Sequence, residues 1–242
     1  MSAALLEVSG LGKRFGGFVA LEGVDLAVTA GERVGLIGPN GSGKSTLVNC
    51  LSGALRNEVG QVRFAGQVLD GMAAHRRTRL GLARSFQLPR PFLSLTVAEN
   101  LRIPIEYVVH ARGAGRIDID ARCSELLELV GLAGRGDELP AGLTQVEMRK
   151  LELARAMAAE PKLLIADEAM AGLSHQEVDD ILGLLLQLND RGVTIVMIEH
   201  IMRAVMQFSQ RLVVLVAGRK IADGPPEEVI RNPEVERAYL GE

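Results

Sequence analysis

A glycine-rich segment near residue 40 has the residue types and the spacing of a phosphate-binding loop. It fits the pattern G-x-x-x-x-G-K-[ST]. Its members are Gly38, Pro39, Asn40, Gly41, Ser42, Gly43, Lys44, Ser45 and Thr46. Glycines in such a loop let backbone N–H groups point at phosphate oxygens, and the following helix adds a favourable dipole. We therefore predict that Lys44 contacts the β- and γ-phosphates of a nucleotide and that Ser45 ligates Mg²⁺.

Two carboxylates stand directly after an apolar run farther along the chain. The run is Leu163–Ala166, and Asp167 and Glu168 follow it. Ligands of parallel α/β sheets bind beyond the carboxyl ends of the strands. We expect Asp167 to hold Mg²⁺, directly or through water, and Glu168 to act as general base on the attacking water. An apolar strand followed by acidic residues is common, and such residues often only meet solvent. The assignment of Asp167 and Glu168 therefore depends on the presence of the phosphate loop in the same chain.

Two further side chains stand at the ends of predicted strands. Gln87 follows the segment Gly81–Phe86, and His200 follows the apolar run Val193–Ile198 and Glu199. An amide at the first position can reach Mg²⁺ or the attacking water, and an imidazole at the second can reach the γ-phosphate. The alternative for His200 is a surface histidine at the start of a helix.

The elements that must position these residues predict an α/β fold of the P-loop NTPase type. Continuous apolar runs are typical of parallel strands covered on both faces. These runs are Val34–Ile37, Leu163–Ala166, Val193–Ile198 and Leu212–Val216. Between the second and third runs, apolar residues recur at helical spacing from Val178 to Leu188, which predicts a crossover helix.

Two other regions depart from this pattern. Shorter segments with polar alternation, Leu5–Val8, Phe18–Val28 and Val59–Phe64, predict an N-terminal antiparallel β-subdomain. Residues from about Leu88 to Ala159 have helical patterns, interrupted by an expected exposed loop at Gly113–Gly115. We therefore expect one domain over residues 1–242, in which a helical subdomain at roughly 88–159 is inserted into a mostly parallel core.

Composition excludes several classes of function. The net charge of the 242 residues is −3, aromatic residues make up 3% and tryptophan is absent, which argues against nucleic acid as a partner. No stretch approaches the roughly 20 apolar residues that span a bilayer, and no signal peptide is predicted. Cys50 and Cys123 match no metal or redox spacing and are expected to be buried thiols.

Taken in order, these motifs resemble those of the ATP-binding subunits of ABC transporters, over essentially the whole chain. The resemblance implies hydrolysis of ATP with Mg²⁺. It makes Gly38–Thr46 the Walker A loop, Leu163–Asp167 the Walker B strand, and Glu168 the catalytic glutamate. Gln87 then matches the Q-loop glutamine and His200 the switch histidine.

Within that family the chain looks most like one of the paired ATPases of branched-chain, or hydrophobic, amino-acid importers. The similar segments are Lys13–Gly17, Ala83–Gln87, Thr96–Leu101, Ala171–Leu173 and Asn232–Gly241. The last of these also resembles the ending of lipopolysaccharide-export ATPases, which remain an alternative. Phe15, in the first segment, matches the aromatic that stacks on adenine, with an ordinary packed aromatic as the alternative.

The resemblance also locates a signature segment that departs from the family pattern Leu-Ser-Gly-Gly-Gln. Its residues are Leu143, Thr144, Gln145, Val146 and Glu147. In the family this segment acts on ATP held by the other ATPase, so Val146, in place of a glycine, bears on the partner's site and not on this chain's own, and whether it supports hydrolysis is open. Ala169, where the family has a proline, is a second departure. The alternative function is therefore a regulatory or weakly hydrolysing nucleotide-binding subunit.

The family further implies the partners. They are a second ABC ATPase, two integral-membrane permeases and an extracytoplasmic solute-binding protein, with no nucleic acid. Both a homodimer and a heterodimer are open, and the altered signature favours the heterodimer. We expect the chain on the cytoplasmic face of the cell membrane as a peripheral subunit. The segment Leu88–Asn100 is the expected permease contact, with a rigid surface loop as the alternative. The transported solute and the permeases' identity cannot be read from this chain.

Overall fold

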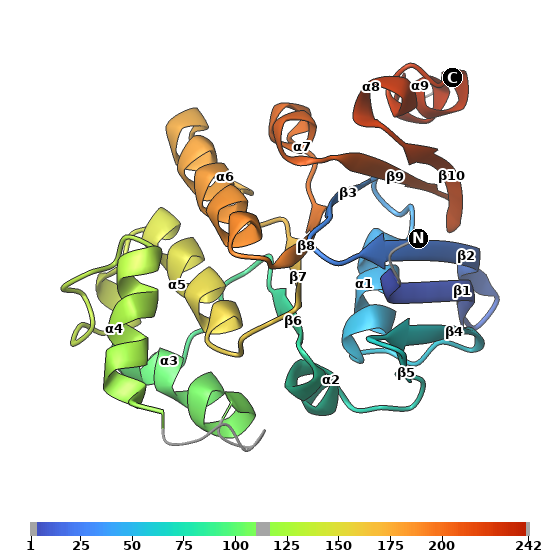
Figure 1. The fold of residues 1–242 in the computed structure, drawn as a ribbon. Helices are drawn as coiled ribbons and strands as arrows, with labels where there is room; N and C mark the ends of the chain where they lie inside the picture. Colours follow the sequence, from blue (N-terminus) through green and yellow to red (C-terminus); the bar gives the residue numbers. More distant parts are fainter. Residues whose placement is uncertain (1–3, 110–116, 241–242) are drawn as a thin grey trace.

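The computed structural model describes residues 4–109 and 117–240, and places them in two β-sheets flanked by helices (Figure 1). The larger sheet has the strand order β10-β9-β3-β8-β7-β6. Its strands are β3 (Arg33–Ile37), β6 (Leu82–Ser85), β7 (Leu163–Asp167), β8 (Thr194–Ile198), β9 (Arg211–Val216) and β10 (Arg219–Gly224). All neighbours pair in parallel except β9 and β10, which form an antiparallel hairpin. The four predicted apolar strands are thus confirmed, and β10 is an addition.

The smaller sheet confirms the predicted antiparallel β-subdomain. It has the order β2-β1-β4-β5 and contains β1 (Ala4–Phe15), β2 (Phe18–Thr29), β4 (Val59–Phe64) and β5 (Gln67–Val68). Burial alternates along β2 from Val24 to Val28, because one face of the sheet packs inward and the other meets solvent. The first strand is longer than the predicted Leu5–Val8 and reaches Phe15 through several register shifts.

Within the described residues, the chain between β6 and β7 contains helices joined by turns and irregular segments, and no strand, as predicted. It contains α3 (Val97–Pro104), a π-helical turn (Ile105–Val109), α4 (Ile119–Leu129), a 3₁₀ turn (Pro140–Gly142) and α5 (Gln145–Met157). The expected loop at Gly113–Gly115 lies outside the described residues. The crossover helix is α6 (His175–Asp190), and it joins β7 to β8. No helix within residues 4–109 and 117–240 has the length and apolar character needed to cross a bilayer.

The remaining helices border the two sheets. They are α1 (Lys44–Ser52), α2 (Ala74–Leu80), α7 (Met202–Phe208), α8 (Pro226–Val229) and α9 (Pro233–Leu240). Sequence patterns predicted α1 but none of the other four, because α2, α7 and α8 span only one or two turns and carry too few periodic positions.

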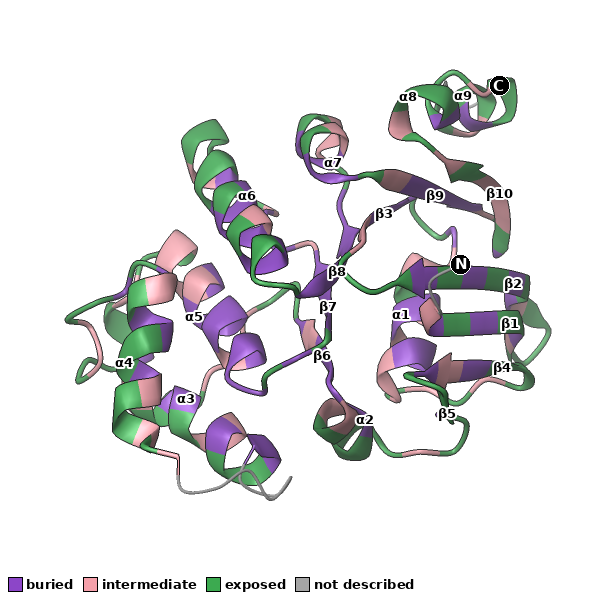
Figure 2. Ribbon diagram, in the orientation of Figure 1, coloured by how far each residue is buried: buried purple, intermediate pink, exposed green. Residues whose placement is uncertain are grey.

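The hydrophobic core has two parts, one on each face of the larger sheet. On one face α1 lies between the two sheets and buries Leu47, Val48 and Leu51. On the other face α3 to α7 cover the strands, as the burial colouring in Figure 2 shows. Helix α1 and helix α5 therefore stand on opposite faces of the same sheet.

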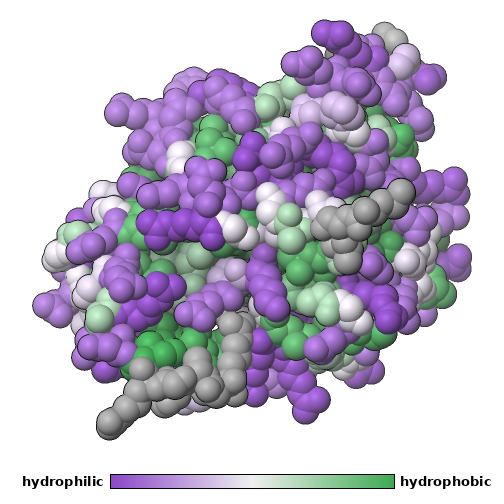
Figure 3. Space-filling model, viewed as in Figure 1, coloured by the Kyte–Doolittle hydropathy of each residue, from purple (hydrophilic) through white to green (hydrophobic). Residues whose placement is uncertain are grey.

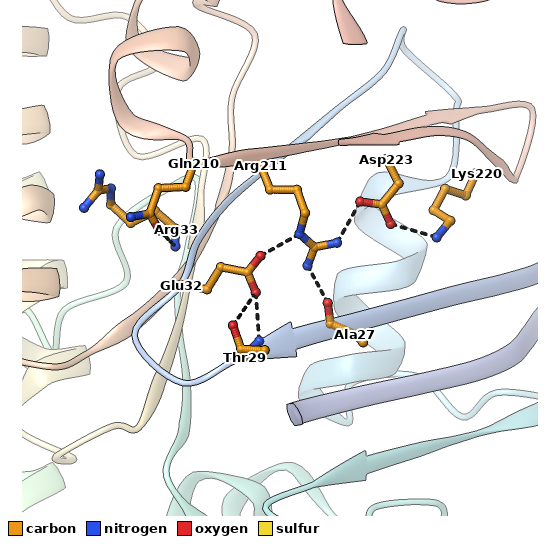
Figure 4. Close-up of polar contacts among 8 residues, drawn as sticks. All are labelled: Ala27, Thr29, Glu32, Arg33, Gln210, Arg211, Lys220 and Asp223. Atoms are coloured by element: carbon orange, nitrogen blue, oxygen red, sulfur yellow. Dashed lines mark hydrogen bonds and ion pairs between the residues drawn. The ribbon is translucent and has the colours of Figure 1, made fainter. Parts of the chain in front are cut away.

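A half-buried arginine links the larger sheet to the smaller one (Figure 4). Arg211 begins β9, and its Nε lies 2.5 Å from Oε1 of Glu32, while its Nη1 lies 2.7 Å from Oδ1 of Asp223. It also donates to the carbonyl oxygen of Ala27 on β2. Glu32 in turn accepts from the backbone N–H of Thr29 at 2.8 Å. This network holds the segment that leads into β3, and so fixes the start of the strand before the phosphate loop.

The network predicts a pH-dependent loss of stability in a Glu32→Gln variant. Burial favours the neutral carboxyl, but hydrogen bonds from Arg211 and Thr29 outweigh it and lower the pKa of Glu32 below its ordinary value. A lowered pKa in the folded state stabilises the fold above pH 4.5, and this contribution is lost as the pH falls further. We expect the variant to lose about 1–3 kcal/mol at pH 7, and urea titrations should show that difference shrinking by pH 4. Glu58→Gln, which breaks the exposed pair with Lys13, is the control and should change stability little. An equal loss for Glu32→Gln at both pH values would contradict the assignment.

Candidate nucleotide-binding site

The glycine-rich loop connects the buried strand β3 to the first turn of α1. Gly41 and Gly43 have φ of +76° and +101°, a left-handed backbone that glycine adopts without strain. A Cβ on Gly43 would stand 2.6 Å from the carbonyl oxygen of Ala20, so the loop also needs glycine for its close approach to β2. The backbone N–H of Gly218 donates to the carbonyl of Ser42 at 3.0 Å and ties the loop to the β9–β10 turn.

The side chain of Lys44 curls over this loop. Its Nζ donates to the carbonyl oxygens of Gly38 at 2.6 Å and Pro39 at 3.1 Å. Burial lowers the pKa of Lys44, and the charges of Glu168 and Asp167 partly offset that effect. The ammonium group therefore lies within electrostatic reach of both carboxylates, and the structure brings together the lysine and the acidic pair that the sequence singled out.

Strand register places the acidic pair level with the end of β3. Ile198 on β8 is paired with Leu36 on one side and with Asp167 on the other. The three strands consequently end at the same height, and the residues that follow them share one edge of the sheet. Glu168 has φ of +47°. A non-glycine residue rarely adopts this value, and it turns the chain sharply away from β7.

Both carboxylates already have partners. Oδ2 of Asp167 accepts from Nη2 of Arg84 at 2.6 Å, and Oε2 of Glu168 accepts from Nε2 of Gln87 at 2.5 Å. Gln87 lies two residues beyond the end of β6, so its side chain reaches the edge where β7 ends. Gln87 and Glu168 are therefore in direct contact, as neighbours of one site should be.

His200 follows β8 at the same edge. Its side chain is 66% exposed, with Nδ1 at 3.8 Å from Oε2 of Glu199. Glu199 is buried and accepts from the backbone N–H of Met170 at 2.8 Å. Burial is the main cause that raises the pKa of Glu199. This carboxylate joins the segment after β8 to the segment after β7, and the side chain of His200 stays largely exposed beside it.

Arg149, a residue that sequence patterns did not single out, connects the site to the helical region. It is buried on α5 and donates to the carbonyl oxygens of Gln87 and Ala171, the latter at 3.1 Å. Burial lowers the pKa of Arg149. In the sequence, Arg149 can be noticed only as a charged residue among the apolar positions of a helix. That pattern does not indicate which groups it contacts.

The other predicted residues lie farther away. Phe15 ends β1 with its side chain 47% exposed, and the ammonium of Lys13 stands 5.3 Å from its ring centroid. The signature segment, residues 143–147, forms the start of α5, and Thr144 is the N-cap of that helix. Since α5 and α1 cover opposite faces of the sheet, the structure separates the signature from the chain's own phosphate loop.

The residues present fit Mg²⁺ by their donor chemistry. The hydroxyl of Ser45, a carboxylate oxygen of Asp167 and the amide oxygen of Gln87 are hard oxygen donors. Within the described ranges, no group of three or more His, Cys, Asp or Glu side chains is placed to hold a metal. Mg²⁺ in nucleotide sites takes one or two carboxylates and completes its shell with phosphate oxygens and water, so a sparse set of side chains is suitable.

Comparisons with known proteins agree with a nucleotide-binding site at this edge of the sheet. A family model described as ABC transporter matches residues 21–171, and one described as branched-chain amino acid ATP-binding cassette transporter matches residues 219–242. The chain is 39% identical to the high-affinity branched-chain amino acid transport ATP-binding protein BraF of Pseudomonas aeruginosa and 37% identical to LivG of Escherichia coli K12, with full coverage of each chain. Its fold superposes with a TM-score of 0.88 on an ATP-binding cassette of an ABC transporter solved in its ADP conformation, at 31% identity and full coverage of both.

Proposed function

This chain belongs to the ABC transporter family of ATP-binding subunits, and we propose that it drives an importer of branched-chain amino acids. The observation that carries the proposal is full-length similarity to ATP-binding proteins of that transport class. The strand register supports it, because the glycine-rich loop and the pair Asp167 and Glu168 lie at the same edge of the larger sheet. The lipopolysaccharide-export alternative has no comparable support. We further propose that residues 1–242 act as one ATP-binding domain.

The residues of the site have distinct roles in this proposal. Lys44 and the N–H groups of the loop bind the β- and γ-phosphates, and Ser45, Asp167 and Gln87 hold Mg²⁺, which when bound neutralises charge on the phosphate oxygens. Glu168 takes a proton from water as that water forms a bond to the γ-phosphorus and the bond to ADP breaks. His200 donates a hydrogen bond to the γ-phosphate, and Phe15 stacks on adenine.

The hydrogen bond from Gln87 to Glu168 has a consequence for this role. The amide of Gln87 engages Oε2 of Glu168 at 2.5 Å and leaves Oε1 to accept the proton from water. A change in the position of Gln87 would therefore reorient the Glu168 carboxylate. Because Arg149 holds the backbone of Gln87 to α5, movement of the helical region can supply that change.

We propose that a second ABC ATPase completes each site from the opposite side. In this chain Glu147 caps its own helix, since its Oε2 accepts from the backbone N–H of Thr144 at 2.8 Å and from its hydroxyl at 2.9 Å. Glu147 is also paired with Arg135 at 2.6 Å, and Val146 puts a branched side chain where the family pattern has a glycine. The signature of this chain therefore supports hydrolysis poorly, which favours a heterodimer with a different ATPase.

We propose that the permeases dock in an apolar groove between the sheet and α3. The groove has a volume of about 370 Å³, and its lining includes Phe86, Phe92, Pro104 and Tyr107. Exposed Leu88 and Leu93 extend its apolar character outside the groove. Figure 3 shows apolar side chains at the surface over α3, within a surface that is otherwise mostly hydrophilic. This docking would hold the subunit at the cytoplasmic face of the membrane, with a solute-binding protein on the other side.

Substitution of Glu168 tests the motor function. In proteoliposomes with the permeases and the binding protein, Glu168→Gln should lower ATP turnover and leucine uptake about 100-fold or more, because the base is lost. ATP affinity should stay within a few-fold of the wild type, since phosphate binding depends on the loop. Glu128→Gln, an exposed carboxylate on α4, is the matched control and should change neither rate. Uptake that survives Glu168→Gln would contradict the proposal.

Substitutions of Val146 test the signature. Residue 146 lies inside α5, and any residue can adopt the helical backbone there. The expected obstacle to hydrolysis is therefore the bulk of the valine side chain, and not a lack of glycine flexibility. ATP turnover by the assembled pair of ATPases should rise several-fold in Val146→Gly and by a smaller factor in Val146→Ala, which keeps one carbon. Turnover that both variants leave unchanged would show that this side chain does not limit hydrolysis.

A charge in the groove tests the docking surface. Tyr107→Asp, at a side chain 66% exposed, should weaken co-purification with the permeases at least tenfold, because a desolvated carboxylate would face an apolar partner. The isolated chain should bind ATP normally. Val59→Asp, on β4 with 61% exposure, controls for surface charge and should leave assembly intact. Equal assembly of both variants would place the permease contact elsewhere.

A further inference from the structure

A largely buried arginine contacts two of the elements that carry the proposed Mg²⁺ ligands. Arg84 lies on β6, and its Nη2 donates to Oδ2 of Asp167 at 2.6 Å. Its Nη1 donates to Oδ1 of Asn49 at 2.7 Å and to Oγ of Ser52 at 3.4 Å. Asn49 and Ser52 both belong to α1, one and two turns after Ser45. One guanidinium therefore contacts both the Walker B carboxylate and the helix that begins at the phosphate loop.

Sheet topology explains why such a link is useful. Ser45 stands on α1 directly after β3, whereas Asp167 ends β7, and β8 separates these two strands in the sheet. No backbone pairing therefore joins the two ligand-bearing elements directly. A rigid, planar group with donors on two nitrogens can set the distance between them, which a flexible lysine cannot do as well.

The environment of Arg84 strengthens the link. The side chains of Arg84 and Asp167 are 13% and 10% exposed, so water cannot readily replace either partner. The guanidinium also lies 5.3 Å from the ring centroid of Phe86, the residue before Gln87. Among the described residues, Arg84 is the one side chain that donates to the Asp167 carboxylate, and it engages one oxygen and leaves the other for a cation.

We propose that Arg84 is a positioning residue of the nucleotide site. It holds the Asp167 carboxylate at a set place relative to α1, so that Mg²⁺ meets a preset arrangement of oxygen ligands. The inference rests on the proposed nucleotide site and gives a role to a residue that had none above, although Arg84 lies in the family-like segment Ala83–Gln87. Arg84 touches no reacting atom, and its effect passes through Asp167 and Asn49.

The test separates metal-dependent from metal-independent binding of nucleotide. ATP affinity of the isolated chain is measured by titration calorimetry with Mg²⁺ and with EDTA, and the ratio of the two affinities is the readout. Arg84→Ala should lower that ratio roughly tenfold or more, as losses of groups that orient a metal ligand typically do. Its affinity in EDTA should stay within about twofold of the wild type, because the phosphate loop is unchanged.

Further variants distinguish positioning from folding. Arg84→Lys keeps the charge but cannot span both partners, so it should restore the ratio only in part. As a single substitution, Asn49→Ala should also lower the ratio. In the double variant it should add little to the effect of Arg84→Ala, because both changes break the same contacts between α1 and Asp167. Arg63→Ala, an arginine on β4 away from the site, is the control and should leave the ratio unchanged.

Each outcome bears on the inference. An unchanged ratio in Arg84→Ala would overturn it, and so would equal losses of affinity in Mg²⁺ and in EDTA with a lowered melting temperature, since these indicate a role in folding alone. If Arg84→Ala does not fold, Arg84→Lys and Asn49→Ala supply the same comparison. A wild-type chain that binds no ATP in either condition would instead overturn the nucleotide site itself, which is a different result.

Discussion

The shared register of β3, β8 and β7 is the constraint on which the rest of the site depends. Because Ile198 pairs with both Leu36 and Asp167, the glycine-rich loop, the acidic pair and the residues after β8 emerge level with one another. A slip of one residue in either pairing would turn Asp167 to the opposite face of the sheet. Full burial of the strands on both faces opposes such a slip, so the hydrophobic core sets the geometry of the polar edge.

Internal partners occupy the charged groups of this edge. Lys44 bonds to its own loop, Asp167 to Arg84, and Glu168 to Gln87. Each contact reduces the cost of holding a charge near a low-dielectric core before a ligand is present. Phosphates and a cation can replace these contacts with stronger ones, so that binding of nucleotide and rearrangement of the edge are coupled. The pair of Gln87 and Glu168 makes this coupling relevant to the reaction, since Gln87 orients the carboxylate of the proposed base.

Buried charged side chains join the segments that meet at this edge. Arg149 reaches the carbonyls of Gln87 and Ala171 from α5, and Glu199 fixes the backbone of Met170 from the segment after β8. Arg149 holds the backbone of Gln87, which directly follows Phe86 of the groove proposed for permeases. A displacement of α5 would therefore reach Gln87 first, because its backbone is held directly by a side chain of that helix.

The sequence by itself determined the phosphate loop, the acidic pair, the four apolar strands and the family. These signals are local: an eight-residue glycine-rich motif, runs of apolar residues, and carboxylates directly after one run. Only the tertiary structure decided the partners of Arg84, Arg149 and Glu199, since the contact of Arg84 with Asp167 joins residues 83 positions apart. It also decided the β9–β10 hairpin and the short helices α2, α7 and α8, whose patterns are too brief to distinguish from loops. Long-range pairing of buried charges depends on which surfaces the core brings together, and residue spacing along the chain carries no record of that.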